Sequence, residues 1–403
     1  MVALLQVSEA LERVLADVSP LPAEDAPLAE AHGRVLAADL TALRTQPPDN
    51  LSAMDGYAVR GADVAQAPAK LKLIGEVAAG RPFAGQVGLG EAARIFTGGV
   101  MPSGADTVVI QEHTERAGDA VIVTRSASTG RNVRLQGLDF RKGEVLLAKG
   151  HRLTSRDLAL AAAMNHARVP VHRRPKVALL ATGDELVMPD RTPGPGQIVY
   201  SNGFALAAMA RAEGCDIADL GIAPDRQDVT MSRIGHARRW GADVLVTAGG
   251  ASVGDYDLVQ QSLKALGLDL SFWRVALRPG RPLLHGRLAD MRVLGVPGNP
   301  VSAFVCAFLF MVPLIRRLAG RIDLEPALEP AVLGGDLAEN DERTDYLRAT
   351  LADHHGTPVA TPFAKQDSSM LAPLAKADCF VVRAPFASAA PAGSRCEIIR
   401  LGL

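Results

Sequence analysis

The sequence is poor in aromatic residues, in cysteine and in net charge. Only 4% of its 403 residues are aromatic, and 43 lysine and arginine residues nearly balance 44 aspartate and glutamate residues, for a formal charge of −1. A chain without a global positive field is not expected to bind nucleic acid. Its four cysteines lie far apart and form no C-x-x-C pair, so we expect reduced, mostly buried thiols.

Several catalytic and targeting motifs are also missing. The sequence contains no Walker A motif, no G-x-G-x-x-G loop, no G-x-S-x-G elbow and no H-E-x-x-H. These absences argue against P-loop ATPase, hydride-transfer, serine hydrolase and zinc protease chemistry. The N-terminal segment has no basic region, and the longest apolar run, residues 301–315, is short for a bilayer span and is expected to form a buried core helix. We therefore expect a cytoplasmic protein that makes no membrane contact.

The length and the hydrophobic pattern predict several domains around one α/β domain. A chain of this length is too long for a single core, and 48% hydrophobic residues are typical of globular proteins. Short apolar runs alternate with helical patterns between about residues 175 and 320, which favours a doubly wound parallel sheet. Strands are expected at 177–182, 243–247 and 292–296, and helices at 203–214, 226–240, 256–266 and 300–318.

The segments on both sides of this region have a different pattern. A helix is expected over residues 8–18 with Ser8 as its cap, and Thr154 with Asp157 resembles a capping box that opens a second helix. Short β-rich runs separated by glycine and proline predict an all-β module, and the chain returns to short strands after residue 327. The runs of the module lie at 70–77, 107–110, 120–124 and 144–147.

Three polar, glycine-containing loops should meet at one edge of the α/β sheet. Residues 182–186, 249–257 and 297–302 each follow one of the predicted strands. Ligands of open parallel sheets bind outside the carboxyl ends of the strands, so fold geometry would bring these loops together. Each loop alone could equally be a tight turn or a helix-capping segment. Their convergence is what favours a functional site.

The chemistry of these loops indicates a site for phosphate groups. Glycines allow backbone N–H groups to approach an anion, and Asn299 before Pro300 predicts an N-cap whose helix N-terminus faces a phosphate. The candidate substrate- and phosphate-binding residues are Gly249, Gly250, Ser252, Gly254, Asp255, Pro297, Asn299, Pro300 and Ser302.

Carboxylates in the same loops indicate a magnesium ion. Asp184, Glu185, Asp255 and Asp257 supply hard oxygen ligands, and Mg²⁺ prefers carboxylates together with substrate phosphates. A metal beside a glycine-lined anion pocket suggests chemistry on a phosphoanhydride.

A cluster of arginines predicts an oxyanion site. Arg274 and Arg278 would point to the same face of one strand, and the Pro279-Gly280 link would keep Arg281 close to Arg278. Guanidinium groups in this arrangement suit a planar or tetrahedral oxyanion. The alternative is a solvated hairpin that carries surface arginines.

Longer motifs identify a resemblance to the molybdopterin molybdenumtransferase family, which includes the E domain of gephyrin. Residues 52–59 (SAMDGYAV), 96–112 (FTGGVMPSGADTVVIQE) and 132–139 (NVRLQGLD) resemble three hallmarks of that family. The loops TGDEL, GGASVGDYD and PGNPVSA complete the set in the family's order. This chain departs from the family pattern at two places. It carries arginines where many members carry lysines, and its C-terminal segment contains Asp367, whose carboxylate would repel an oxyanion, in place of a glycine-rich sequence.

The resemblance implies a multidomain α/β fold and an elongated homodimer with its site at the dimer interface. It implies four domains: a first (linker and dimer) domain from residues 1–44 and 140–173, an inserted β module at 45–139, an α/β molybdopterin-binding catalytic domain at 174–326, and a C-terminal β domain at 327–403.

The resemblance also implies an enzyme that inserts molybdate into adenylylated molybdopterin with Mg²⁺-dependent release of AMP. A molybdopterin adenylyltransferase would be a further partner. The implied catalytic residues are Asp55, Thr97, Asp139, Glu185, Asp225 and Asp257, of which Glu185, Asp225 and Asp257 would hold Mg²⁺. The implied molybdate-binding residues are Arg274, Arg278, Arg281, Arg348 and Ser368.

Three alternatives stay open at this point. A molybdopterin adenylyltransferase would resemble residues 175–320 and would consume ATP. A pterin-binding scaffold would keep the pocket without catalysis. Tungstate could replace molybdate, because both are tetrahedral oxyanions of similar size.

Overall fold

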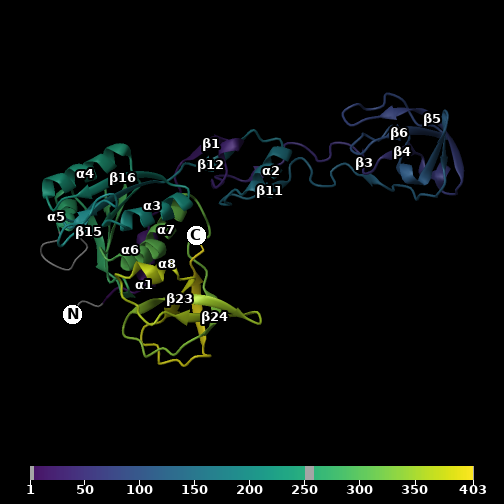
Figure 1. Ribbon diagram of the computed structural model, residues 1–403. Coiled ribbons are helices and arrows are strands. Elements are labelled where there is room, and N and C mark those ends of the chain that lie inside the picture. The colour runs from purple at the N-terminus through teal and green to yellow at the C-terminus, as the bar shows by residue number, and fades with distance from the viewer. Residues whose placement is uncertain (1–3, 250–257, 403) are drawn as a thin grey trace.

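The computed structural model describes residues 4–249 and 258–402, which form an elongated molecule (Figure 1). A β module occupies one end, and the α/β domain with the C-terminal β domain occupies the other. A narrow first domain lies between them, and the chain passes through it twice, on the way out to the module and on the way back.

The α/β domain is built on a six-stranded sheet with the order β16-β13-β17-β21-β20-β18. The first four of these strands are parallel, and the last two are antiparallel. The predicted strands and the doubly wound fold class are confirmed. The strands are β13 (Lys176–Thr182), β16 (Asp216–Ala223), β17 (Val244–Ala248), β18 (Asp269–Arg274), β20 (Pro282–Leu288) and β21 (Met291–Val296).

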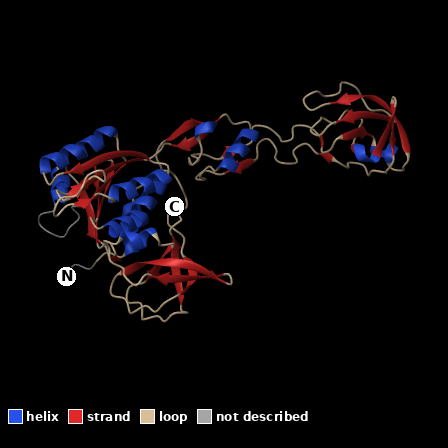
Figure 2. Ribbon diagram, viewed as in Figure 1, coloured by secondary structure: helices blue, strands red, loops and turns tan. Residues whose placement is uncertain are grey.

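Helices cover both faces of this sheet, as Figure 2 shows. Side chains alternate along a strand, so Leu179 of β13 packs with one set of helices and Leu180 packs with the other. Helices α1, α3, α6 and α7 bury their apolar residues with Leu179, whereas α4 and α5 do so with Leu180. The helices are α3 (Asn202–Ala212), α4 (Gln227–Trp240), α5 (Leu258–Ala265), α6 (Pro300–Cys306) and α7 (Val312–Leu318).

The most apolar helix is a core element. Helices α6 and α7 are joined by the π-helical turn η4 (Ala307–Met311) into one helix over Pro300–Leu318. This helix is long and apolar enough to cross a membrane, but 83% of its most apolar window is buried inside the protein. The prediction of a buried core helix is confirmed.

The first domain consists of short paired strands and one capped helix. Strand β1 (Ala23–Pro27) pairs with β12 (Arg168–His172), and β2 (Leu40–Thr41) pairs with β11 (Val145–Leu147). The run at 144–147 therefore belongs to this domain and not, as predicted, to the β module. Thr154 and Asp157 form the predicted capping box of α2 (Ser155–Ala163).

The N-terminal helix lies on the α/β domain instead. Helix α1 (Val7–Leu15) buries Leu11 and Val14 in the main α/β core. Its cap is Gln6 rather than the predicted Ser8, because Val7 already belongs to the helix and packs against that core.

The β module contains a six-stranded sheet with the order β7-β4-β6-β5-β9-β8, and a short β3–β10 pair lies beside it. Two 3₁₀ turns, η2 (Gly61–Val64) and η3 (Gln111–His113), complete it. The strands are β3 (Leu51–Ser52), β4 (Gly56–Val59), β5 (Ala69–Val77), β6 (Glu91–Ile95), β7 (Thr107–Ile110), β8 (Thr114–Ala117), β9 (Ala120–Val123) and β10 (Val133–Arg134).

The C-terminal domain is a barrel of antiparallel and parallel strands. Strand β25 pairs with both β26 and β23, which closes the order β23-β24-β22-β26-β25 on itself, and β19 pairs with β23 from outside. The elements are β19 (Leu277–Arg278), β22 (Glu329–Leu333), β23 (Thr344–His354), β24 (Thr357–Pro362), α8 (Leu371–Ala375), β25 (Cys379–Arg383) and β26 (Arg395–Arg400).

The arginine segment does not form the single strand predicted from the sequence. Arg274 ends β18 of the α/β sheet, whereas Arg278 lies in β19 of the C-terminal sheet. The backbone of Val275 and Ala276 pairs with Leu5 between them, so the chain changes sheets at this point. Strand alternation therefore does not place the two guanidinium groups on one face.

A buried ion-pair cluster anchors the end of α3 to α7, and its loss should destabilise the protein. Glu213 is 4% exposed in its side chain and binds Arg316 at 2.7 Å and Arg321 at 2.5 Å. We expect Glu213→Ala to lower the free energy of unfolding by about 3 kcal/mol, because it removes the carboxylate partner of the largely buried Arg316 and leaves buried Arg321 with Asp323 alone. Denaturant unfolding measures this, with Glu9→Ala in the exposed Glu9–Arg13 pair as control, expected below about 1 kcal/mol. Equal effects of both substitutions would contradict the buried-charge argument.

Candidate functional site

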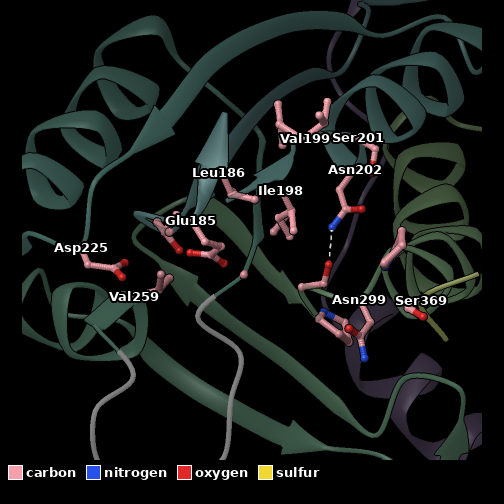
Figure 3. A pocket seen from close by; sticks show the side chains of 18 of the residues that line it. Glu185, Leu186, Ile198, Val199, Ser201, Asn202, Asp225, Val259, Asn299 and Ser369 are labelled. Atoms are coloured by element: carbon pink, nitrogen blue, oxygen red, sulfur yellow. Dashed lines mark hydrogen bonds between the residues drawn. The ribbon is translucent and has the colours of Figure 1, made fainter. Parts of the chain in front are cut away.

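A cavity of about 920 Å³ lies at the carboxyl edge of the α/β sheet (Figure 3). The described parts of the three predicted loops line it, and so do Asp225 after β16 and the short parallel pair β14 (Leu186–Val187) and β15 (Ile198–Val199). Ser369 and Leu371 of the C-terminal domain close one side. The structure thus brings together loops that are more than one hundred residues apart in sequence.

Glycine is required where the loops approach each other. Gly249 has φ = +96°, and a Cβ there would lie 2.7 Å from the carbonyl oxygen of Thr182. The neighbouring loop is also close, because a Cβ on Gly298 would lie 3.9 Å from the Cα of Gly249. A side chain at Gly249 would therefore displace the loop after β13. It would also cover backbone that is now exposed to the cavity.

Two carboxylates face the cavity from neighbouring loops. Glu185 and Asp225 are both exposed, and Figure 3 shows their side chains directed toward the same space. The two loops are linked by the Asp225 N–H, which donates to a carboxylate oxygen of Asp184 at 3.1 Å. Hard oxygen donors on adjacent loops fit a Mg²⁺ ion, which commonly uses one or two carboxylates and completes its shell with water and phosphate.

The remaining residues predicted for this loop cluster lie outside the described part of the chain. They are Gly250, Ser252, Gly254, Asp255 and Asp257. Within residues 4–249 and 258–402, no group of three or more histidine, cysteine, aspartate or glutamate side chains is placed to hold a metal ion. The described residues therefore supply two of the three predicted metal ligands, Glu185 and Asp225.

The N-terminus of α6 differs from the open phosphate-facing end predicted from the sequence. Asn299 is the N-cap residue and Pro300 follows it, as expected, but within the described chain the Asn299 side chain makes no capping bond. Its amide donates instead to the Ser368 hydroxyl at 2.9 Å, and the Val301 N–H donates to the Ser368 carbonyl at 3.0 Å. Ser302 is buried. The C-terminal domain thus occupies part of this helix end.

Arg278 is bound to acidic residues of the C-terminal domain. Its guanidinium donates to both carboxylate oxygens of Asp345, to Asp341 at 3.1 Å and to Asn340 at 2.8 Å. The nearby arginines hold the pKa of Asp341 at about 2, chiefly through the Arg343 hydrogen bond. Burial raises the pKa of Asp345, and its bonds to Arg278 oppose that shift. Arg278 therefore joins two domains.

Arg348 is buried and supports the loop that carries Ser368. It is 1% exposed, and its guanidinium donates to the carbonyls of Met370 at 2.9 Å and Asp367 at 3.0 Å, and to the side chain of Gln366 at 3.2 Å. The Asp367 carboxylate, which the sequence suggested could repel an anion, accepts hydrogen bonds from the Ser369 N–H and hydroxyl. Those two bonds lower the pKa of Asp367.

The other two predicted anion-binding arginines, Arg274 and Arg281, are held by fewer contacts than Arg278 and Arg348. Arg274 stacks on Trp273 at 4.1 Å from the ring centre, and its Nε is buried without a hydrogen-bond partner in the described chain. Arg281 is exposed and precedes Pro282, which lines the cavity. Of the four arginines, Arg278 and Arg348 donate hydrogen bonds and Arg274 stacks on an aromatic ring, whereas the Arg281 guanidinium makes neither kind of contact with any described residue.

Three predicted site residues lie far from the cavity in the same chain. Asp55 and Thr97 belong to the β module at the opposite end of the molecule, and exposed Asp139 lies where the module joins the first domain. Asp55 accepts hydrogen bonds at 2.7 Å from both the N–H and the hydroxyl of Thr97. The Thr97 backbone bond is the largest cause of the lowered pKa of Asp55.

Some site residues were not predicted from the sequence. Asn202 begins α3, lines the cavity and donates to the Gly298 carbonyl at 2.8 Å. Its place beside Ser201 before a helical pattern is a capping signal that could have identified it. Arg94 packs on Tyr57 and Phe96 and donates to the Gly56 carbonyl, next to the Asp55 loop. Its partners come from three segments, so no local pattern indicated it.

The chain matches three family models in order along the sequence. They are the MoeA N-terminal region (domain I and II) over residues 5–165, a probable molybdopterin binding domain over 178–317, and the MoeA C-terminal region (domain IV) over 330–401.

Proteins and structures of this kind are similar along nearly the full length. The chain is 33% identical to the molybdopterin molybdenumtransferase of Haemophilus influenzae, with 94% of each chain covered. It is 34% identical to that of Bacillus subtilis, which covers 94% of this chain and 90% of the relative. Two structures of a molybdopterin biosynthesis MoeA protein from Pyrococcus horikoshii cover 99% of this chain and 99% and 100% of their own, at 31% and 28% identity, with TM-scores of 0.85 and 0.82.

Proposed function

The chain belongs to the MoeA family of molybdopterin molybdenumtransferases, enzymes of molybdenum cofactor biosynthesis, and on that premise we propose that it inserts molybdate into adenylylated molybdopterin and releases AMP in a Mg²⁺-dependent reaction. The observation that carries this proposal is a single large cavity with two carboxylates on one side and hydrogen-bonding groups of the C-terminal domain on the other.

The cavity suits a substrate that combines a flat apolar ring with phosphate groups. Leu186, Ile198 and Leu371 supply apolar lining against which a pterin can pack. Gly249 leaves backbone exposed beside the 297–300 loop, so a phosphate group can approach closely. The pterin and adenylate phosphates would lie over these two loops.

Glu185 and Asp225 would hold the magnesium ion, together with Asp257. When bound, Mg²⁺ neutralises charge on the phosphoanhydride. Glu185 and Asp225 line the side of the cavity opposite the C-terminal domain, and this is where they would hold the ion. Cleavage of the anhydride would require an oxygen from molybdate or water to complete the AMP phosphate. As the two dithiolene sulfurs bind molybdenum, two Mo–O bonds would break, and each of these oxygens that AMP does not take would leave as water with two protons from the thiols or solvent.

Arg281 is the arginine best placed to attract molybdate. Arg278 and Arg348 already bind protein oxygens, so Arg278 serves mainly to attach the C-terminal domain and Arg348 serves mainly to hold the loop that carries Ser368. We expect Arg281→Ala to raise the molybdate concentration for half-maximal AMP release by about 10-fold, because one charge-assisted hydrogen bond to the anion is lost. Steady-state titration with molybdate measures this, and Arg281→Lys should recover part of the affinity. An unchanged titration curve in Arg281→Ala would remove this residue from the anion site.

We further propose that the complete site includes a second copy of the chain. Asp55 and Thr97 form an exposed, hydrogen-bonded pair at the far end of the molecule, and neither lines the cavity beside Glu185 in the same chain. In a two-fold symmetric dimer of elongated chains, each module could reach the partner's cavity. This arrangement would explain why residues implied in catalysis lie so far from Glu185 in one chain.

The function is tested by AMP release from adenylylated molybdopterin by purified protein, with and without molybdate and Mg²⁺. The proposal predicts release that requires Mg²⁺ and increases with molybdate. Retention of the intact nucleotide would favour the pterin-binding scaffold. Formation of pyrophosphate from ATP and molybdopterin would instead identify an adenylyltransferase. Repeating the titration with tungstate determines which oxyanion is preferred.

A further inference from the structure

The residue that the sequence marks as a helix cap points away from its helix. Asn299 precedes α6 and has an extended backbone, yet its side-chain amide crosses to the C-terminal domain and donates to Ser368 Oγ at 2.9 Å. Asparagine at this position would ordinarily accept a hydrogen bond from the second or third helical amide. The Val301 N–H donates to the Ser368 carbonyl at 3.0 Å. The Asn299 side chain and the first turn of α6 therefore both donate hydrogen bonds to Ser368.

The backbone around Ser368 is held from the opposite side as well. Arg348 binds the carbonyls of Asp367 and Met370, which flank the serine, and the Gln366 side chain accepts from the Arg348 N–H at 3.1 Å. Because Arg348 is 1% exposed and fixed by several bonds, the loop has little freedom to move relative to the barrel. With the backbone held in place, rotation of the Ser368 hydroxyl is the main motion that decides where its proton points.

The hydrogen bonds leave one specific proton uncommitted. A serine hydroxyl has one donor and two acceptor positions. One acceptor position of Ser368 is occupied by the Asn299 amide, and no described residue accepts the Ser368 proton. The neighbouring Ser369 differs, because its hydroxyl donates to the Asp367 carboxylate at 2.6 Å. Ser368, at the cavity edge between the lining residues Asn299 and Ser369, therefore retains a proton for an anion.

We propose that Asn299 is a positioning residue that acts through Ser368. By donating to Ser368 Oγ, the Asn299 amide prevents the hydroxyl from donating to Asn299 and directs its proton to the oxyanion. This inference rests on the proposed function, because the oxyanion is the molybdate that the enzyme transfers. It assigns Asn299 an indirect part in anion binding rather than the direct phosphate contact predicted from the sequence.

Asn299→Asp reverses the direction of this hydrogen bond with almost no change in shape. A carboxylate cannot donate, so it would accept the Ser368 proton and remove it from the anion. The Asn299 side chain makes no capping bond to α6 in the described chain, and aspartate is equally favourable at an N-cap position, so α6 should remain intact. We expect the KM for molybdate to rise about 10- to 100-fold with little change in the midpoint of thermal unfolding.

A double-mutant cycle separates positioning from simple charge repulsion. Ser368→Ala should also raise the KM for molybdate, and Asn299→Asp in the Ser368→Ala background should add nothing further. Repulsion of the anion by the new carboxylate would persist without the serine, so additive effects would overturn the proposal. Asn299→Ser, which replaces the amide with an uncharged hydroxyl that can donate or accept, should show a smaller rise that likewise vanishes without Ser368.

The outcome is distinguishable from failure of the proposed function. If the wild-type protein releases no AMP under any condition, the function is wrong and the cycle has no signal. If the wild type responds to molybdate and Asn299→Asp titrates like the wild type, the function stands and the positioning inference is overturned.

Discussion

AMP release should fall by at least about 100-fold in Glu185→Ala, while the protein remains folded. Glu185 is exposed at the carboxyl edge of the sheet and lines the cavity opposite the C-terminal domain, so its side chain supports no core packing. Loss of its carboxylate would remove one of the ligands proposed for Mg²⁺. Single-turnover release of AMP from adenylylated molybdopterin, read together with thermal unfolding, measures both parts of this result.

Two further variants show whether the loss of AMP release in Glu185→Ala is caused by loss of the negative charge. Glu185→Gln keeps the shape of the side chain and should be nearly as inactive as Glu185→Ala, because an amide is a poor Mg²⁺ ligand. Asp228→Ala removes an exposed carboxylate of α4 that pairs with Arg226, and it should leave turnover within about twofold of wild type. A high Mg²⁺ concentration should partly restore AMP release by Glu185→Gln. Normal turnover by Glu185→Ala would exclude Glu185 from the mechanism.

Two inactive variants should restore activity when their subunits are mixed. Asp55→Ala lacks the β-module contribution, and Glu185→Ala lacks the cavity contribution. In a heterodimer, the intact cavity of the Asp55→Ala subunit meets the intact module of its partner, so one of the two sites is complete. Random exchange of subunits gives half heterodimers, and the mixture should therefore recover about one quarter of wild-type activity.

The mixing experiment needs its own control. The double variant Asp55→Ala with Glu185→Ala, mixed with either single variant, should remain inactive because none of the resulting dimers contains even one site that combines an intact Asp55 with an intact Glu185. If the mixture of single variants is also inactive although mass measurement finds heterodimers, the two residues do not act in one site. Activity of a monomeric wild-type protein would contradict the assembly altogether.

Local sequence patterns were sufficient for the α/β fold and for the position of the cavity. Apolar runs mark strands that are buried on both faces, and β13 and β17 lie within one residue of the predicted bounds. Because ligands of a parallel sheet bind at the carboxyl ends of the strands, the loops after these strands could be expected to meet. The cavity lined by Thr182, Gly249 and Pro297 is where that rule places it.

The roles of the arginines could not be predicted from the same patterns. Arg278 was expected to face an anion, but its partner Asp345 lies 67 residues further along the chain. Arg348 was expected to contact the anion directly, yet the loop that it supports begins 18 residues away. Which cation is free and which is already paired depends on contacts between domains, and strand alternation carries no information about these contacts.

Asn299 illustrates the same limit at a single residue. Its position before a proline and a helix correctly predicts the cap position. The direction of its amide depends on Ser368, which belongs to another domain and lies 69 residues away. The pairing of Asp55 with Thr97 spans 42 residues and is likewise invisible to local reasoning, although both residues were identified through the family resemblance.

The central claim is that cleavage of the phosphoanhydride and insertion of molybdenum occur together in the cavity beside Glu185 and Asp225. The most direct test is to count AMP released and molybdenum bound to pterin in the same reaction while molybdate is varied. The account predicts equal amounts of the two products at every molybdate concentration that supports turnover. AMP released in excess, with no matching molybdenum in the pterin product, would show a hydrolase rather than a transferase and would contradict the account.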